Sequence, residues 1–352
     1  MKKILFILET LFGGGAERVT SELASEIGKN HKYEVHVLTF NRTEHDYVLP
    51  EYVIRHFPEK SVTNKIEQLM YLVTIISGQR PDVIVSLAMP KTNVLLSLST
   101  LFTKSRVILS ERNDPKSLPR NKLLRFLRLC TYYYADGVVF QTEEARAFFP
   151  SKVQKKSVII CNPIKIDLPE VYSGVREKSI VNYCRFEPQK NLPMLIKAFA
   201  QVSNEYPEYT LMLYGKGTQK EELEKLIKNL GLENRVILND FSVNIHDIVK
   251  KASLFVSSSN YEGISNTMLE SMALGLPVIC TDCPAGGARM VIKDGINGLL
   301  VPVGDDLILA EKIRVLLSDE TLRKQIGEKA SEIRNIYSLD AISSKWIEYI
   351  ED

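Results

Sequence analysis

The chain has 352 residues, of which 45% are apolar and 25% are charged, so its composition is that of a globular protein rather than a disordered or fibrous one. A chain of this length is too long to fold around one ordinary hydrophobic core, and it suits two domains of roughly 150–200 residues. The net charge of +2 is unevenly divided, because residues 1–160 carry 23 Lys and Arg against 16 Asp and Glu and the remainder carries 22 against 27; the basic half therefore favours an anionic partner.

No segment near the start resembles a membrane span or a secretion signal. The apolar run at residues 4–8 is far shorter than the roughly 20 residues that cross a bilayer, and no signal-peptide cleavage pattern follows it. Five cysteines scattered from Cys130 to Cys283 do not suit a disulfide framework. We therefore expect a cytoplasmic protein with free thiols.

Short β-rich runs alternate with longer helical patterns along the chain. We expect strands at residues 3–8, 33–40, 82–87, 106–110, 137–141 and 158–161, and again at 180–183, 209–214, 236–238, 254–257, 277–281 and 298–301. This alternation predicts an α/β protein with two Rossmann-like, doubly wound parallel sheets. Because Pro163 and Pro169 interrupt any helix between the two series, we expect domains at 1–163 and 177–337, a linker at 164–176, and a last helix at 338–352 that packs back on the first domain.

A glycine run, Gly13-Gly14-Gly15, separates the first expected strand from the first expected helix. Glycines at this position let backbone amides approach an anion at the positive end of the helix, although a tight packing turn explains them equally well. The spacing is not that of the dinucleotide-binding fingerprint, which requires G-x-G-x-x-G.

Residues 116–129 are rich in basic and apolar side chains and contain no acidic residue. A helix starting near Pro119 would place Lys122, Arg125 and Arg128 on one side and leucines with Phe126 on another. Such a basic amphipathic helix suits an anionic membrane surface and the pyrophosphate of a polyprenyl-linked acceptor. The alternative is an ordinary domain helix with a solvated basic face.

Three motifs of the second half follow expected strands. Arg185 and Lys190 stand five residues apart, so both cations can reach neighbouring oxygens of one diphosphate at the sheet edge where ligands of α/β proteins bind. Gly215 and Gly217 follow the next strand and leave room for a nucleotide. Residues 260–277 place Glu262 in a loop and Glu270 about one turn inside a helix whose start is signalled by Ser, Asn and Thr.

The Glu-x7-Glu spacing, followed by Gly275 and Pro277, resembles the signature of glycosyltransferase family 4. The likeness extends to the triple-glycine loop, Arg185 with Lys190, and the Asn297-Gly298 segment near the end. It implies the GT-B fold and a retaining, metal-independent sugar transfer. Arg185, Lys190 and Glu262 would be the catalytic residues, with the two cations on the donor diphosphate, Glu262 near the sugar and Glu270 on the ribose. The further donor-binding positions that we expect are Gly14, Gly15, Arg112, Gly215, Gly217, Gly263, Ile264, Ser265, Asn266, Thr267, Gly286 and Gly287.

Two positions depart from the family pattern. Many relatives carry a histidine after the strand at 106–110, where this sequence offers Arg112, which suits a phosphate better than a polarised hydroxyl. Relatives commonly carry a glutamate where this chain has Arg289. A single C-x-x-C at Cys280 and Cys283 has no second pair and predicts neither zinc nor redox chemistry.

The expected partners are a nucleotide-sugar donor, with UDP favoured by family frequency, and a glycan or polyprenyl-diphosphate-linked acceptor. We expect no cofactor, metal or nucleic acid, and a peripheral position at the inner face of the plasma membrane. Two alternatives remain at this stage: a sugar-nucleotide epimerase of the same fold, and a non-catalytic nucleotide-sugar-binding subunit.

Overall fold

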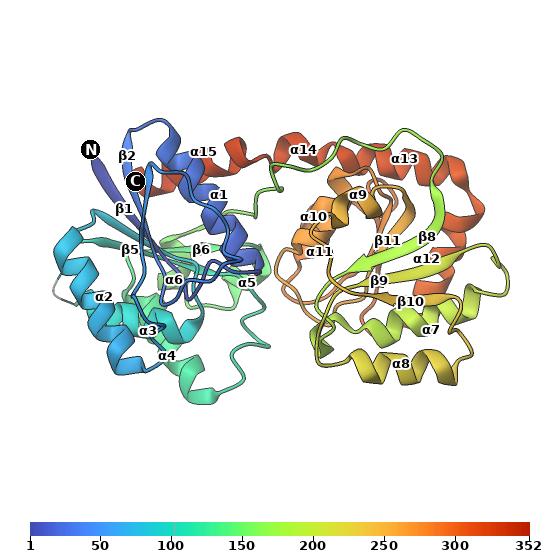
Figure 1. Cartoon of the computed structure of the whole chain (residues 1–352), viewed down its shortest axis with the longest axis horizontal. Helices are drawn as coiled ribbons and strands as arrows, with labels where there is room; N and C mark the ends of the chain where they lie inside the picture. Colours follow the sequence, from blue (N-terminus) through green and yellow to red (C-terminus); the bar gives the residue numbers. More distant parts are fainter. Residues whose placement is uncertain (102) are drawn as a thin grey trace. The chain divides into compact units, whose positions relative to one another are not determined.

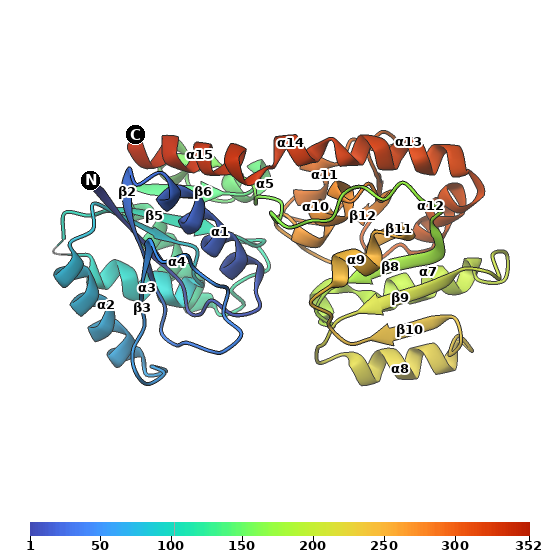
Figure 2. The same ribbon diagram turned by 45° about the horizontal axis from the view of Figure 1, so that its top comes forward.

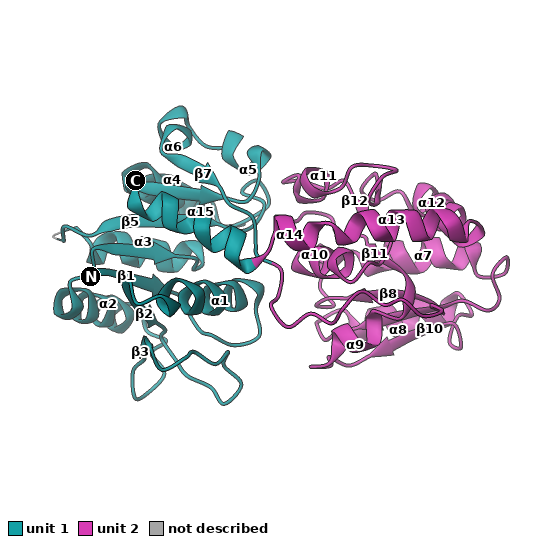
Figure 3. Ribbon diagram, turned by 90° about the horizontal axis from the view of Figure 1, so that it is seen from above, with its two compact units in different colours: residues 1–163, 339–352 teal, residues 164–338 magenta. Residues whose placement is uncertain are grey.

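The structure, a computed structural model, describes residues 1–101 and 103–352. It consists of two compact units (Figure 3): unit 1 comprises residues 1–163 and 339–352, and unit 2 comprises residues 164–338. Each unit is built on one parallel sheet covered by helices, as the alternating sequence pattern predicts.

The sheet of unit 1 contains seven parallel strands within the described residues, in the spatial order β3-β2-β1-β4-β5-β6-β7. The strands are β1 (Lys2–Ile7), β2 (Tyr33–Leu38), β3 (Val53–His56), β4 (Val83–Ser86), β5 (Arg106–Glu111), β6 (Gly137–Phe140) and β7 (Ser157–Ile159). β4 and β6 are buried along their whole length, because helices cover both faces of the sheet. The edge strand β3 was not predicted, since its four residues include Arg55 and His56 and show no apolar run.

The helices of unit 1 are α1 (Gly15–Lys29), α2 (Lys65–Gln79), α3 (Pro90–Ser99), α4 (Lys122–Tyr134), α5 (Glu143–Ala147), α6 (Ser151–Lys155) and α15 (Leu339–Glu351). The side chains of Asn64 and Asn121 cap α2 and α4. Figures 1 and 2 show α2, α3 and α4 next to one another, and α3 contacts both others. The last helix, α15, buries Trp346 and packs against α1.

The sheet of unit 2 has the strand order β10-β9-β8-β11-β12-β13, again parallel throughout. Its strands are β8 (Glu177–Tyr183), β9 (Thr210–Tyr214), β10 (Val236–Asn239), β11 (Ala252–Ser257), β12 (Val278–Thr281) and β13 (Leu299–Val301). Its helices are the 3-10 turn η1 (Pro188–Lys190), α7 (Leu192–Val202), α8 (Lys220–Asn229), α9 (Ile245–Val249), α10 (Asn266–Ala273), α11 (Gly287–Val291), α12 (Asp306–Ser318), α13 (Glu320–Ser331) and α14 (Ile333–Ile336).

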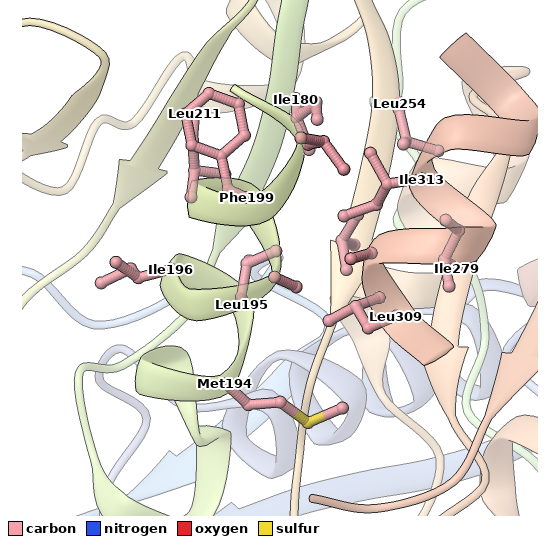
Figure 4. Close-up of a cluster of buried hydrophobic side chains, with 14 of the residues drawn as sticks. Ile180, Met194, Leu195, Ile196, Phe199, Leu211, Leu254, Ile279, Leu309 and Ile313 are labelled. Carbon is pink, nitrogen blue, oxygen red and sulfur yellow. The ribbon is translucent and has the colours of Figure 1, made fainter. Parts of the chain in front are cut away.

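The core of unit 2 lies between one face of the sheet and helices α7 and α12 (Figure 4). Leu195 and Phe199 from α7 meet Leu309 and Ile313 from α12 over Ile180 and other strand residues, and all of these side chains are inaccessible to solvent. Burying a side chain of this size contributes roughly 1.5–3 kcal/mol. This packing holds the strands in register and so fixes the positions of the loops at their carboxyl ends.

Candidate active site

The carboxyl ends of β8, β9, β11 and β12 meet at one edge of the unit 2 sheet, and the four segments that follow them carry the residues expected from the motifs. Ligands of open α/β sheets bind outside this edge. The site is therefore assembled from loops 184–191, 215–218, 258–265 and 282–287.

Lys190 and Glu262 form an ion pair at this edge. The Lys190 ammonium lies 2.9 and 3.0 Å from the two carboxylate oxygens of Glu262, and Gln189 donates a further hydrogen bond of 2.9 Å to Oε2. Burial disfavours the charged ammonium, but the Glu262 carboxylate outweighs this effect and raises the pKa of Lys190. Lys190 is therefore a fixed cation at neutral pH.

Backbone contacts between two loops hold this pair in place. The Asn260 amide donates to the Gln189 carbonyl at 2.8 Å, and the Asn260 side chain donates to the Pro188 carbonyl at 2.9 Å. The Ser258 hydroxyl bonds the carbonyls of Lys190 and Asn191. These hydrogen bonds tie the loop after β8 to the loop after β11.

Arg185 differs from Lys190 in its surroundings. Its side chain is exposed, and within residues 1–101 and 103–352 its guanidinium makes no hydrogen bond or ion pair. The chain therefore offers one cation already engaged by a carboxylate and a second that is available to a ligand anion.

The start of α10 adds a positive helix end to the same edge. Ser265 caps the helix by accepting from the Met268 amide at 3.4 Å. The segment Gly263–Thr267, with Ile264 buried and Asn266 and Thr267 partly exposed, precedes and opens this helix. Helix starts attract anions, because the partial positive charge of the macrodipole gathers there.

Glu270 lies in the middle of α10 and is 6% exposed. Its Oε2 is 2.9 Å from His246 Nε2, and His246 is itself buried on α9. Tyr183, at the end of β8, donates to the Thr267 carbonyl and pairs with the Ser271 hydroxyl, so it is bound to α10 on both sides of Glu270.

The glycines of the site allow backbones to touch. A Cβ on Gly287 would lie 1.7 Å from the Gly263 carbonyl oxygen, and Gly286, at φ +79°, turns the chain into α11. A Cβ on Gly215 or Gly217 would lie 1.9 or 2.3 Å from a carbonyl oxygen of the loop after β8. We expected Gly215 and Gly217 to leave space for a nucleotide, but the structure gives close loop packing as the reason for glycine there.

A cavity of about 10 Å³ is lined by Glu262, Ser257, Ser265 and Cys280, among others. A cavity of this volume holds at most one water molecule. Burial raises the pKa of the Cys283 thiol to about 12 and also raises that of Cys280. Both thiols are therefore neutral at neutral pH, and that this C-x-x-C carries no chemistry stays a prediction.

In unit 1, Arg112 follows β5 and is half-buried. Its guanidinium donates to the Asn162 side chain and, at 3.4 Å, to the Ser110 hydroxyl, while Gln141 donates to the same Asn162 oxygen at 2.7 Å. Burial lowers the pKa of Arg112 to about 10, which still leaves it charged at neutral pH. Gly14 caps α1 at the same edge of this sheet, and Gly15 is the first residue of that helix.

Arg128 does not belong to an exposed basic face, and the prediction that grouped it with Lys122 and Arg125 is wrong. Its side chain is 1% exposed, lies 3.3 Å from the Glu111 carboxylate, and donates to the carbonyls of Pro115 and Leu118. Lys122 is exposed, whereas Arg125 is only partly exposed and donates to the carbonyls of Pro119 and Lys116. The exposed side of α4 instead combines Lys122 with two apolar side chains, Leu123 and Phe126, which are more than 60% exposed.

Two sequence models of known families match the chain. One, described as Glycosyltransferase Family 4, covers residues 13–168, and the other, described as glycosyl transferases group 1, covers residues 169–333. Together they span both units. The chain is a glycosyltransferase, with one glycosyltransferase family model matched in each half.

Several relatives of this glycosyltransferase are bacterial enzymes named for transfer to glycans. A Campylobacter jejuni enzyme named as an α-1,4-N-acetyl-D-galactosaminyltransferase acting on a GalNAc-containing, diphosphate-linked undecaprenol is 27% identical, over all of this chain and 99% of its own length. The amylovoran biosynthesis glycosyltransferase AmsD of Erwinia amylovora is 26% identical over 98% of this chain and 99% of its own. The solved structure of Anabaena HepE in complex with UDP-glucose covers both chains fully with a TM-score of 0.85 at 21% identity, which confirms the GT-B fold.

Sequence reasoning about this glycosyltransferase missed several residues that surround the expected ones. Gln189 stands beside Lys190 in the sequence, and its position within the motif was a usable signal. His246 comes from a five-residue helix outside the motifs, and Asn162 lies at the end of the first expected domain, so nothing in the sequence singled them out. Arg289, the second departure from the family, forms an exposed ion pair with Asp282.

Within the described residues, no three or more potential metal ligands gather into one group. No helix in this part of the chain combines the length and the hydropathy that a membrane span needs.

Proposed function

We propose that this glycosyltransferase moves a sugar from a UDP-sugar to a lipid-linked or polysaccharide acceptor during assembly of a bacterial surface glycan. The observation that carries the proposal is the edge of the unit 2 sheet, where Lys190, Glu262 and Arg185 stand beside the start of α10. The names of the relatives support the acceptor class, and the UDP complexes of HepE support the nucleotide.

The site suits a leaving diphosphate. Arg185 and Lys190 offer two cations, and the amides that open α10 add hydrogen-bond donors to a phosphate oxygen. Fixed donors of this kind stabilise charge that develops as the sugar departs. Glu270 is placed one turn further along the helix, where its carboxylate would accept hydrogen bonds from the ribose hydroxyls.

We infer that the reaction retains the anomeric configuration. The bond between the anomeric carbon and the diphosphate oxygen breaks, the acceptor oxygen bonds to the same face of that carbon, and the acceptor proton passes to the departing phosphate oxygen. Glu262, whose two oxygens are held by Lys190 and Gln189, is a binding group for the sugar rather than a free base in this scheme. We also propose that no divalent metal is required, since Arg185, Lys190 and the helix start offset the leaving-group charge.

We further propose that unit 1 rests on the anionic inner face of the plasma membrane through the exposed apolar side chains of α2, α3 and α4. This α2–α4 surface consists of Ile66, Met70 and Val73 of α2, Leu98 of α3, Leu101 just after α3, and Leu123 and Phe126 of α4. The exposed lysines Lys65, Lys104 and Lys122 accompany it. Apolar side chains flanked by lysines match the interfacial region of an anionic bilayer.

A screen of nucleotide sugars for protection against thermal unfolding tests the donor assignment. UDP-sugars should raise the unfolding temperature of the wild-type protein, and the Lys190→Ala variant should lose this protection. Consumption of the donor without any acceptor would point to an epimerase, and protection without transfer to any acceptor would point to a binding subunit.

A further inference from the structure

The buried carboxylate of Glu270 is held by a side chain that the proposed reaction does not use. His246 Nε2 lies 2.9 Å from Glu270 Oε2, and both side chains are about 10% exposed or less. The two residues come from different helices, α9 and α10, so their contact is a feature of the fold and not of one local turn.

The His246 ring is fixed by its neighbours. The Tyr183 ring stands edge-on to it, with ring centroids 5.9 Å apart and an interplanar angle of 89°. Tyr183 is in turn bound through its hydroxyl to Thr267 at 3.0 Å and Ser271 at 2.9 Å, which flank Glu270 on α10. On its other side, Tyr183 packs against Phe255 of β11.

This arrangement restricts the orientation of the Glu270 carboxylate. An imidazole that donates from Nε2 engages one oxygen of Glu270 and limits rotation of the carboxylate about its last torsion. A carboxylate in a single orientation can accept two hydrogen bonds from a vicinal diol without first losing rotamer freedom. The same effect could not come from Tyr183, whose hydroxyl is already bound to α10.

We propose that His246 is a positioning residue for nucleotide binding, which holds Glu270 in the orientation that accepts the two ribose hydroxyls. The inference rests on the proposed function, in which Glu270 contacts the ribose. It makes His246 responsible for part of the preference for a ribonucleotide over one that lacks these hydroxyls.

Calorimetric titration of UDP and of 2′,3′-dideoxy-UDP into three proteins tests the inference. The proteins are the wild type, His246→Leu, which keeps side-chain bulk but has no donor, and His246→Gln, whose amide can donate from a similar position. His246→Leu should weaken UDP binding about tenfold, because the Glu270 carboxylate would then have to be ordered when the ligand binds, and should leave dideoxy-UDP binding unchanged. His246→Gln should recover most of the loss, and kcat at saturating donor should stay within about twofold of the wild-type value.

The outcomes separate the two claims. If the wild type binds UDP and dideoxy-UDP equally, Glu270 does not contact the ribose, and that part of the proposed function fails together with the inference. If the wild type discriminates and His246→Leu discriminates equally well, the ribose contact stands and the role of His246 is refuted. Equal weakening of both ligands in both His246 variants, with a lower unfolding temperature, would make His246 a purely structural residue and also overturn the inference.

Discussion

Lys190 and Arg185 lie at the same edge of the unit 2 sheet, but the Lys190 side chain is held in place and the Arg185 side chain is not. Lys190 is nearly enclosed and already shares its charge with Glu262, whereas Arg185 extends into solvent. A donor diphosphate would therefore meet one cation that is held in place and one that can adjust. Both contacts strengthen as negative charge develops on the leaving group.

Replacing either cation with alanine should lower the rate of sugar transfer by about 100- to 1,000-fold, because each removes a donor to charge that develops in the transition state. Arg185→Ala should leave the unfolding temperature unchanged, since its guanidinium has no partner in the described structure. Lys190→Ala should lower it modestly through loss of the Glu262 pair. Steady-state kinetics with both variants checks this prediction.

Lys220→Ala provides the matched control, because Lys220 is an exposed lysine of the same unit, paired at 3.5 Å with Asp240. It should transfer sugar at the wild-type rate. If the rate of sugar transfer falls by less than about tenfold in both Arg185→Ala and Lys190→Ala, these residues do not bind the donor diphosphate.

Only part of the site in unit 2 could be predicted from the sequence. Glu262 and Lys190 could be placed together, because residues that follow adjacent parallel strands meet at one edge. Their direct ion pair could not be predicted, since it depends on the hydrogen bonds between loops 188–191 and 258–262. The contact of His246 with Glu270 could not be predicted either, because Glu270 lies 24 residues further along the chain and on another helix.

At the scale of elements, α4 was predicted as a helix but with the wrong exposed side. The absence of acidic residues between positions 114 and 136 suggested that all its cations were solvated. The partner of Arg128 is instead Glu111 at the end of β5, together with two carbonyls of the loop between them. A buried ion pair formed by residues far apart in sequence leaves no mark in the periodicity of a single helix.

Glu111 should make unit 1 less stable as pH rises. Burial raises the pKa of Glu111 to about 7, in spite of Arg128 opposite, so the folded protein binds this proton more tightly than the unfolded chain does. The contribution to the free energy of unfolding is complete below about pH 4.5 and is lost as pH rises to about 7, by up to about 3 kcal/mol.

Thermal unfolding of the wild type and of Glu111→Gln at pH 5 and pH 8 measures this effect. The wild type should lose more stability than the variant between the two pH values, because the amide does not ionise. Equal losses in both proteins would show that Glu111 is already ionised at pH 5.

We expect the α2–α4 surface to bind anionic liposomes. A triple variant with Lys122→Gln, Leu123→Ser and Phe126→Ser should partition onto anionic liposomes at least 100-fold more weakly than the wild type. The loss combines about 1 kcal/mol for the charge with the burial of two apolar side chains. The wild-type attraction should also weaken as salt rises.

Leu307→Ser is the matched control for this surface, since Leu307 is 69% exposed on α12 of unit 2. It should bind liposomes like the wild type. Arg128 is unsuitable for such a test, because removing it would leave buried carbonyls of Pro115 and Leu118 without their donor and would destabilise unit 1. Wild-type partitioning of the triple variant at low salt would show that α4 is an ordinary domain helix.

At the scale of the whole molecule, the two parallel sheets and their strand positions were predicted to within a few residues from the alternation of apolar runs. The exception is β3, whose pairing with β2 is decided by the tertiary structure and not by its own composition. Family resemblance supplied the roles of the motifs, and the structure supplied their contacts.

The central claim is that the edge of unit 2 supports metal-independent transfer with retention of configuration. The most direct measurement is transfer from a UDP-sugar to a polyprenyl-diphosphate-linked glycan in excess chelator, with the anomeric configuration of the product determined by NMR. We expect a product linkage of the same configuration as the donor, at a rate that chelation does not change. An inverted linkage, or activity that chelation abolishes and added metal restores, would contradict it.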